Sequence, residues 1–161
     1  LVFDAMTKLN NPNLRFIVMG DGPLKDEFEC KAAGLNVTFT GRLPYEQMCG
    51  VMTACDMLVN PIVGSSVASI INKHADYAAS GKPVINTQKS KEYRELIEQF
   101  GMGRNCDDVM GLADEMRNLI EENRLGKQMG KNARSCAEKR FDRKITYSKL
   151  TDTITTTRKI T

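Results

Sequence analysis

The sequence contains no tryptophan, a single histidine and no pair of cysteines spaced C-x-x-C. One histidine, His74, cannot supply two imidazole ligands to zinc, and the cysteine pairs of zinc ribbons are missing. No partner is evident from which a histidine-based triad could be built around His74. We therefore predict no metal site and no catalytic histidine, and we expect His74 to be a partly exposed helix residue.

The five cysteines are scattered and odd in number, which argues against a disulfide framework and favours reduced thiols in a cytoplasmic protein. They are Cys30, Cys49, Cys55, Cys106 and Cys136. No apolar run approaches the roughly 18 residues that a membrane-spanning helix requires. Aromatic residues make up only 6% of the chain, and no aromatic and basic surface of the nucleic-acid-binding type is visible.

Positive charge is concentrated at the C-terminal end. Residues 1–123 carry 12 Lys and Arg against 17 Asp and Glu, whereas residues 124–161 carry 11 against 3. Such a basic segment can contact phosphates or an anionic membrane surface from the cytoplasmic side. It can equally be a solvated helix face, and the charge pattern leaves both interpretations open.

Short apolar runs alternate with longer amphipathic segments throughout the chain, which is typical of strands that alternate with helices. The predicted strands cover residues 14–19, 36–40, 57–60 and 83–87, with an edge strand at 102–105. The predicted helices cover residues 1–9, 24–33, 44–55, 71–80, 92–99, 107–123, 125–139 and 143–156.

This alternation predicts right-handed βαβ units and a parallel sheet. The four main strand runs are apolar on both faces, as a sheet covered by helices on both sides requires. The length suits one domain. We therefore predict a single doubly wound α/β domain over residues 1–161, with its last helices at about 124–157.

Four loops follow the carboxyl ends of the predicted strands, where open parallel sheets bind their ligands. They are Gly20–Pro23, Gly41–Pro44, Pro61–Lys73 and Thr87–Lys91. In the first, Gly20 and Gly22 permit close backbone approach to a ligand, although a plain tight turn explains them as well. Neither G-x-G-x-x-G nor a phosphate-binding P-loop is present.

The third loop leads into a helix with Lys73 near its first turn. Free N–H groups at the helix start, together with Lys73, would hold a diphosphate. Asp76 lies three residues later on the same helix face, so the alternative is an exposed ion pair between Lys73 and Asp76. Spacing alone does not separate these interpretations.

Several motifs together resemble the C-terminal domain of glycosyltransferase family 4, the retaining GT-B enzymes that use nucleotide sugars. The matching segments, in the family's order, are FIVMGDGP at 16–23, VTFTGRL at 37–43, ACDMLVNP at 54–61, DYAASGKP at 76–83, and NAR at 132–134 followed by Phe141. NKHADYAASGKP at 72–83 further resembles a variant pattern found in transferases that build O-antigen, capsule and other surface polysaccharides.

The resemblance implies a Rossmann-like half of a GT-B fold that binds the donor. The residues that would bind the donor fall into two groups. Gly20 and Gly22 would contact it through their backbone, Ser65 and Ser66 would do so from the third loop, and Lys73 would bind the diphosphate. Arg42 and Leu43 would lie beside the nucleotide base, and Asp76 would bind the ribose hydroxyls. The family's first glutamate would stand eight residues before Asp76, where this chain has Ala68.

The resemblance also implies that the whole enzyme moves a sugar from a nucleoside diphosphate sugar, a uridine one, to a polysaccharide or lipid-linked acceptor with retention. No general base, cofactor or metal is expected in this half. The family's first strand and its N-terminal acceptor domain have no counterpart in the sequence, so we expect these residues to be an inactive part of a longer enzyme. The alternatives are a GT-B sugar-nucleotide epimerase and a non-catalytic α/β nucleotide-binding module.

Overall fold

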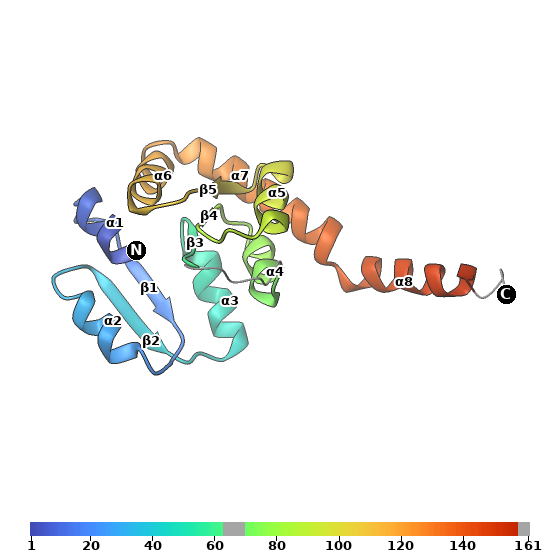
Figure 1. Cartoon of the computed structure of the whole chain (residues 1–161), viewed down its shortest axis with the longest axis horizontal. Coiled ribbons are helices and arrows are strands. Elements are labelled where there is room, and N and C mark those ends of the chain that lie inside the picture. Colours follow the sequence, from blue (N-terminus) through green and yellow to red (C-terminus); the bar gives the residue numbers. More distant parts are fainter. Residues whose placement is uncertain (63–69, 158–161) are drawn as a thin grey trace.

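The computed structural model describes residues 1–62 and 70–157, in which short strands alternate with helices (Figure 1). The strands are β1 (Phe16–Met19), β2 (Val37–Gly41), β3 (Leu58–Asn60), β4 (Val84–Asn86) and β5 (Gly103–Asn105). The helices are α1 (Val2–Leu9), α2 (Lys25–Lys31), α3 (Tyr45–Ala54), α4 (Asn72–Ala79), α5 (Lys91–Phe100), α6 (Val109–Glu121), α7 (Asn123–Cys136), the π-helix η1 (Ala137–Phe141) and α8 (Arg143–Thr157).

The predicted strands and helices are confirmed, because local signals mark where they begin and end. Ser90 and Asp108 cap α5 and α6, each accepting a hydrogen bond from a backbone N–H in the first turn. Gly101 ends α5 in the left-handed conformation, with φ of 61°, which glycine adopts without strain.

All strand pairs are parallel, as predicted, but they form two hydrogen-bonded ladders. One ladder joins β1 to β2, with Phe16 opposite Val37, and the other has the order β3-β4-β5. Within the described residues, no ladder bond joins β1 to β3. Sequence periodicity indicates where each strand lies but not which strands pair with each other. The division into two ladders was therefore not predicted.

One apolar core nevertheless connects the two ladders. Helix α1 packs against α6, burying Ala5 and Met6 with Leu112 and Met116, and Ile85 from the centre of the three-stranded ladder joins them. Phe16 of β1 and Val59 of β3 pack against the same cluster. The strand ends are therefore held by a continuous packed interior.

A second core cluster holds the C-terminal helices on α4 and α5. Tyr93 and Ile97 of α5 are buried together with Ala133 and Cys136 of α7. Beyond η1, helix α8 projects away from the rest of the domain (Figure 1). No helix in the described part of the chain is both long enough and apolar enough to cross a bilayer.

Candidate functional site

The carboxyl ends of β1 and β2 are joined by two glycines. The Gly20 N–H donates to the Gly41 carbonyl over 2.8 Å, and the residues form an isolated bridge. Both have positive φ, 132° at Gly20 and 67° at Gly41, which explains the glycine at each position. A Cβ atom added at Gly20, Gly22 or Gly41 would meet nothing within 4 Å. The backbone of the predicted first loop is therefore open to a ligand.

The second predicted loop continues directly into α3. Arg42 is exposed and Leu43 is half-buried, and Pro44 stands at the N-cap position of the helix. Pro44 suits the start of a helix because the first turn leaves its N–H groups unpaired. The loop predicted to contact the nucleotide base is therefore followed directly by Tyr45, the first residue of α3.

Lys73 and Asp76 both lie on α4, as predicted, but they do not form the ion pair that was the alternative interpretation. No carboxylate of the described residues lies within ion-pair distance of the half-buried Lys73. Burial lowers the pKa of its ammonium group. The Asp76 carboxylate has a different partner, since its Oδ1 accepts a hydrogen bond of 2.8 Å from the hydroxyl of Tyr45.

Tyr45 was not predicted as a site residue. It lies 31 residues before Asp76, and no local pattern reports a contact between two helices so far apart in sequence. The hydrogen bond to Asp76, then a hydrogen bond to Cys49 and the negative charge of Asp76, raise the pKa of the Tyr45 hydroxyl to about 12. A small hollow of about 90 Å³ lies beside this pair, between α3 and α4.

The expectation that His74 is partly exposed is wrong, because its side chain is fully buried. Its ring stacks on that of Tyr93 with centroids 3.5 Å apart and planes 4° from parallel. Its Nδ1 accepts a hydrogen bond of 3.2 Å from the Ile71 N–H at the start of α4. Burial, with a smaller contribution from the Lys73 charge, lowers the pKa of His74 to about 4. The ring is therefore neutral at pH 7 and has a structural environment.

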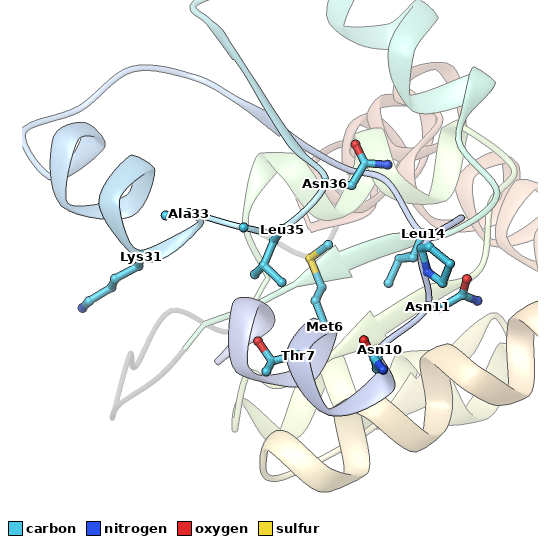
Figure 2. A pocket seen from close by; sticks show the side chains of 11 residues that line it. Met6, Thr7, Asn10, Asn11, Leu14, Lys31, Ala33, Leu35 and Asn36 are labelled. Atoms are coloured by element: carbon cyan, nitrogen blue, oxygen red, sulfur yellow. The ribbon is translucent and has the colours of Figure 1, made fainter.

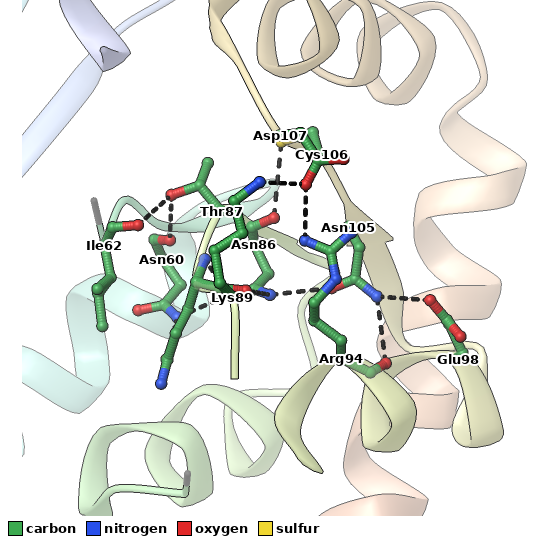
Figure 3. A network of polar contacts seen from close by, with 11 residues as sticks. Asn60, Ile62, Asn86, Thr87, Lys89, Arg94, Glu98, Asn105, Cys106 and Asp107 are labelled. Atoms are coloured by element: carbon green, nitrogen blue, oxygen red, sulfur yellow. Dashed lines mark hydrogen bonds and ion pairs between the residues drawn. The ribbon is translucent and has the colours of Figure 1, made fainter. Parts of the chain in front are cut away.

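Buried amides form a network at the ends of β3, β4 and β5 (Figure 3). The Asn60 amide donates to Asn86 Oδ1 over 2.8 Å and to Gln88 Oε1 over 3.1 Å. The Asn86 amide in turn donates to Asn105 Oδ1 over 2.9 Å. Buried polar groups are costly unless they are hydrogen-bonded, so this network fixes the strand ends relative to one another. The sequence did not reveal it, because asparagine at a strand end is normally part of a turn.

Two cations near the end of β4, Lys89 in the following loop and Arg94 on α5, are already paired. Lys89 and Arg94 both contact the carboxylate of Asp107 (Figure 3), the Arg94 bond measuring 3.0 Å. The hydrogen bond from Lys89 and the charges of both cations lower the pKa of Asp107. These two cations are thus less available to a phosphate than Lys73 is.

A second hollow, bigger than the one beside Tyr45 and Asp76, lies away from the predicted site residues. It measures about 520 Å³ and lies between the end of α1 and the turns before β1 and β2, with Met6, Asn10 and Asn36 in its wall (Figure 2). This is the amino end of the strands. We assign the site by its chemistry, since the charged residues and the open glycine backbone lie at the carboxyl ends.

Two predicted donor-binding residues, Ser65 and Ser66, lie outside the described residues, as does most of the loop that contains them. Among residues 1–62 and 70–157, no three His, Cys, Asp or Glu side chains gather as they would around a metal ion.

Solved structures with the same fold support the α/β assignment. The crystal structure of Anabaena Alr3699/HepE in complex with UDP matches with a TM-score of 0.81 and 23% identity, over 96% of this chain and 44% of that one. WaaG, described as a glycosyltransferase involved in lipopolysaccharide biosynthesis, matches with a TM-score of 0.70 and 21% identity, over 86% of this chain and 37% of that one. At this identity the likeness confirms the predicted Rossmann-like fold, which these structures share.

Sequence comparison gives the family. The sulfoquinovosyl transferase SQD2 of Arabidopsis thaliana is 26% identical over 144 residues, which are 86% of this chain and 27% of that protein. This chain therefore spans less than half the length of the proteins it matches. The family model described as "Glycosyl transferases group 1" matches residues 1–122, which is more than half of the chain. The chain belongs to the group 1 glycosyl transferases.

Proposed function

We propose that this chain is the donor-binding part of a retaining glycosyltransferase that moves a sugar from a UDP-sugar to a polysaccharide or lipid-linked acceptor. The hydrogen bond between Tyr45 and Asp76 carries the proposal. It brings the residue predicted to bind the ribose hydroxyls against the helix that begins at the end of the loop predicted to meet the base. A nucleoside needs these two subsites side by side.

Lys73 would bind the diphosphate. A half-buried ammonium group without a carboxylate partner among the described residues gains more from a bound anion than an exposed, solvated lysine does. The N-terminus of α4 adds a partial positive charge. Lys73 and the helix end together would stabilise the negative charge that develops on the leaving diphosphate. The donor phosphate itself would receive the acceptor proton, so this half needs no general base.

The nature of donor and acceptor is supported by the similar proteins. HepE was solved with UDP and with UDP-glucose, which favours a uridine donor here. WaaG acts in lipopolysaccharide biosynthesis, which favours a glycan or lipid-linked acceptor. The exposed basic side chains near the C-terminus would meet an anionic membrane surface where such acceptors are found. They are Arg124, Lys127, Lys131, Lys139, Arg140, Arg143 and Lys144.

We also propose that a strand from outside these 161 residues completes the sheet. Neither β1 nor β3 has a ladder partner on its second edge among the described strands. In doubly wound sheets of the order 3-2-1-4-5-6, the first strand lies at the centre. A strand preceding α1 would occupy that place, between β1 and β3, and an acceptor-binding domain would precede it.

Nucleotide binding tests the proposed site. We expect UDP to raise the melting temperature of the wild-type chain more than GDP, ADP or CMP does, because bound ligand stabilises the folded state. Asp76→Asn and Lys73→Ala should each raise the Kd for UDP about tenfold, since each removes a charge-assisted hydrogen bond. Calorimetric titration measures both constants.

Two matched variants control for the loss of charge. Asp56→Asn removes an exposed carboxylate at the amino end of β3, and Lys127→Ala removes an exposed ammonium group on α7. Both should bind UDP as the wild type does. Absence of nucleotide stabilisation in the wild type, or equal UDP affinity in all four variants, would refute the site.

A further inference from the structure

Tyr45 is exposed to solvent, but its hydroxyl forms a hydrogen bond with a side chain of another helix. Its side chain is 63% exposed, yet its hydroxyl donates to Asp76 Oδ1 over 2.8 Å. An exposed tyrosine hydroxyl can bond to water without restricting its rotamer. Holding it against a carboxylate on another helix therefore orders two side chains at once, at the junction of α3 and α4.

The Asp76 carboxylate retains acceptor capacity in this arrangement. A carboxylate has two oxygens with about four lone-pair directions, and Tyr45 uses only one of them. The aspartate side chain is short, with a single methylene group between its Cα atom and the carboxylate. A fixed rotamer matters more for such a side chain, because fewer of its orientations present an oxygen to a ligand beside α3.

Tyr45 is also placed to connect two subsites. It is the first residue of α3 and follows Arg42, Leu43 and Pro44, the loop predicted to contact the base. Movement of that loop would move the hydroxyl that holds Asp76. The hollow beside the pair is lined by residues of α3 and α4, including Met52 and Ala79, so the two helices face each other here.

We propose that Tyr45 is a positioning residue for the donor ribose: it holds the Asp76 carboxylate with one oxygen and leaves the other oxygen to accept a ribose hydroxyl. This inference rests on the proposed function, since it assumes that Asp76 meets the ribose. It adds that binding of the nucleotide base by the loop before α3 and binding of the ribose by Asp76 are coupled through the Tyr45 hydroxyl. The raised pKa of Tyr45 agrees with this contact, since the carboxylate favours the neutral, donating hydroxyl.

The test compares Tyr45→Phe with the wild type for two ligands, UDP and 2′,3′-dideoxy-UDP. Phenylalanine removes only the hydroxyl and keeps the ring. We expect the Kd for UDP to rise about two- to tenfold, the cost of ordering one side chain on binding. The Kd for the dideoxy nucleotide should stay unchanged, because it has no ribose hydroxyl for Asp76. Tyr147→Phe is the matched control, since Tyr147 is equally exposed but lies on α8.

Ultraviolet titration of the tyrosines supplies an independent measurement. The wild type should contain a tyrosine that ionises near pH 12, and in Asp76→Asn its pKa should fall part of the way back, because the contribution of Cys49 remains. A spectrum that Asp76→Asn leaves unchanged would show that the contact is absent, and would overturn the inference whatever the binding data.

The outcomes separate the inference from the proposed function. If the wild type binds UDP and loses affinity in Asp76→Asn but not in Tyr45→Phe, the positioning role is refuted and the site stands. Tighter UDP binding by Tyr45→Phe would also refute it, because Tyr45 would then compete with the ribose. An equal loss for both nucleotides would also refute the positioning role, because the effect of Tyr45 would then not depend on the ribose hydroxyls. If Asp76→Asn binds UDP normally, the proposed function fails, and the positioning role fails with it.

Discussion

Gly130→Ala is expected to destabilise the domain by about 3 kcal/mol, the upper range for forcing extra atoms into a packed interior. A Cβ atom at this position of α7 would lie 2.3 Å from the carbonyl oxygen of Gly81, well inside van der Waals contact. The obstacle is backbone rather than a flexible side chain. Gly81 itself has φ of 69° and follows the end of α4, so it cannot easily move away. Urea unfolding followed by circular dichroism measures the difference.

Gly126→Ala on the same helix is the matched control. Its Cβ atom would meet Leu119 and Pro83 at 3.8 and 3.9 Å, which is ordinary contact. Alanine in a helix interior is favoured over glycine by about 1 kcal/mol, so this variant should be slightly more stable than the wild type. Equal stability of the two variants would contradict the close packing of α7 on the end of α4.

Acidification from pH 7.5 to pH 5 should lower the free energy of unfolding by about 2 kcal/mol through His74 alone. Its pKa is about 4 in the folded state, against 6.5 for the unperturbed residue. Above pH 6.5 the ring is neutral in both states and contributes no pH dependence. Between pH 6.5 and pH 4 the unfolded chain binds a proton that the folded chain does not, so stability falls as the pH falls. Below pH 4 this loss is complete.

Two measurements check the assignment to His74. Urea unfolding of His74→Gln at both pH values should show a much smaller difference than the wild type. Because His74 is the only histidine, its ring proton resonance in the folded wild type can be followed by NMR without ambiguity. A midpoint near pH 6.5 would show that the ring is accessible to protons, and would contradict its burial against Tyr93.

The sequence predicted the strands and helices because their signals are local. Glycines with positive φ, such as Gly101, and capping side chains, such as Ser90, act within a few residues. The burial of His74 was predicted wrongly because it depends on Tyr93, which belongs to a later helix. An alanine-rich helix such as α4 has too few large apolar side chains to reveal which face packs inward.

The candidate site was predicted in part for the same reason. The predicted helix over residues 71–80 placed Lys73 and Asp76 together, and the structure has both on α4. The sequence did not indicate that Asp76 binds Tyr45 in preference to Lys73, because that choice depends on how α3 packs against α4. The amide network from Asn60 to Asn105 likewise depends on which strands are neighbours.

Backbone amide NMR during a titration with UDP tests the central claim most directly. We predict that the largest shift changes appear at the carboxyl ends of the strands and the start of α4, at Gly20, Gly22, Arg42, Lys73 and Asp76. The amides of Asn10 and Asn36, in the wall of the large hollow at the opposite end, should not move. Changes confined to that hollow, or no changes with UDP at millimolar concentration, would contradict a donor site built on Lys73 and Asp76.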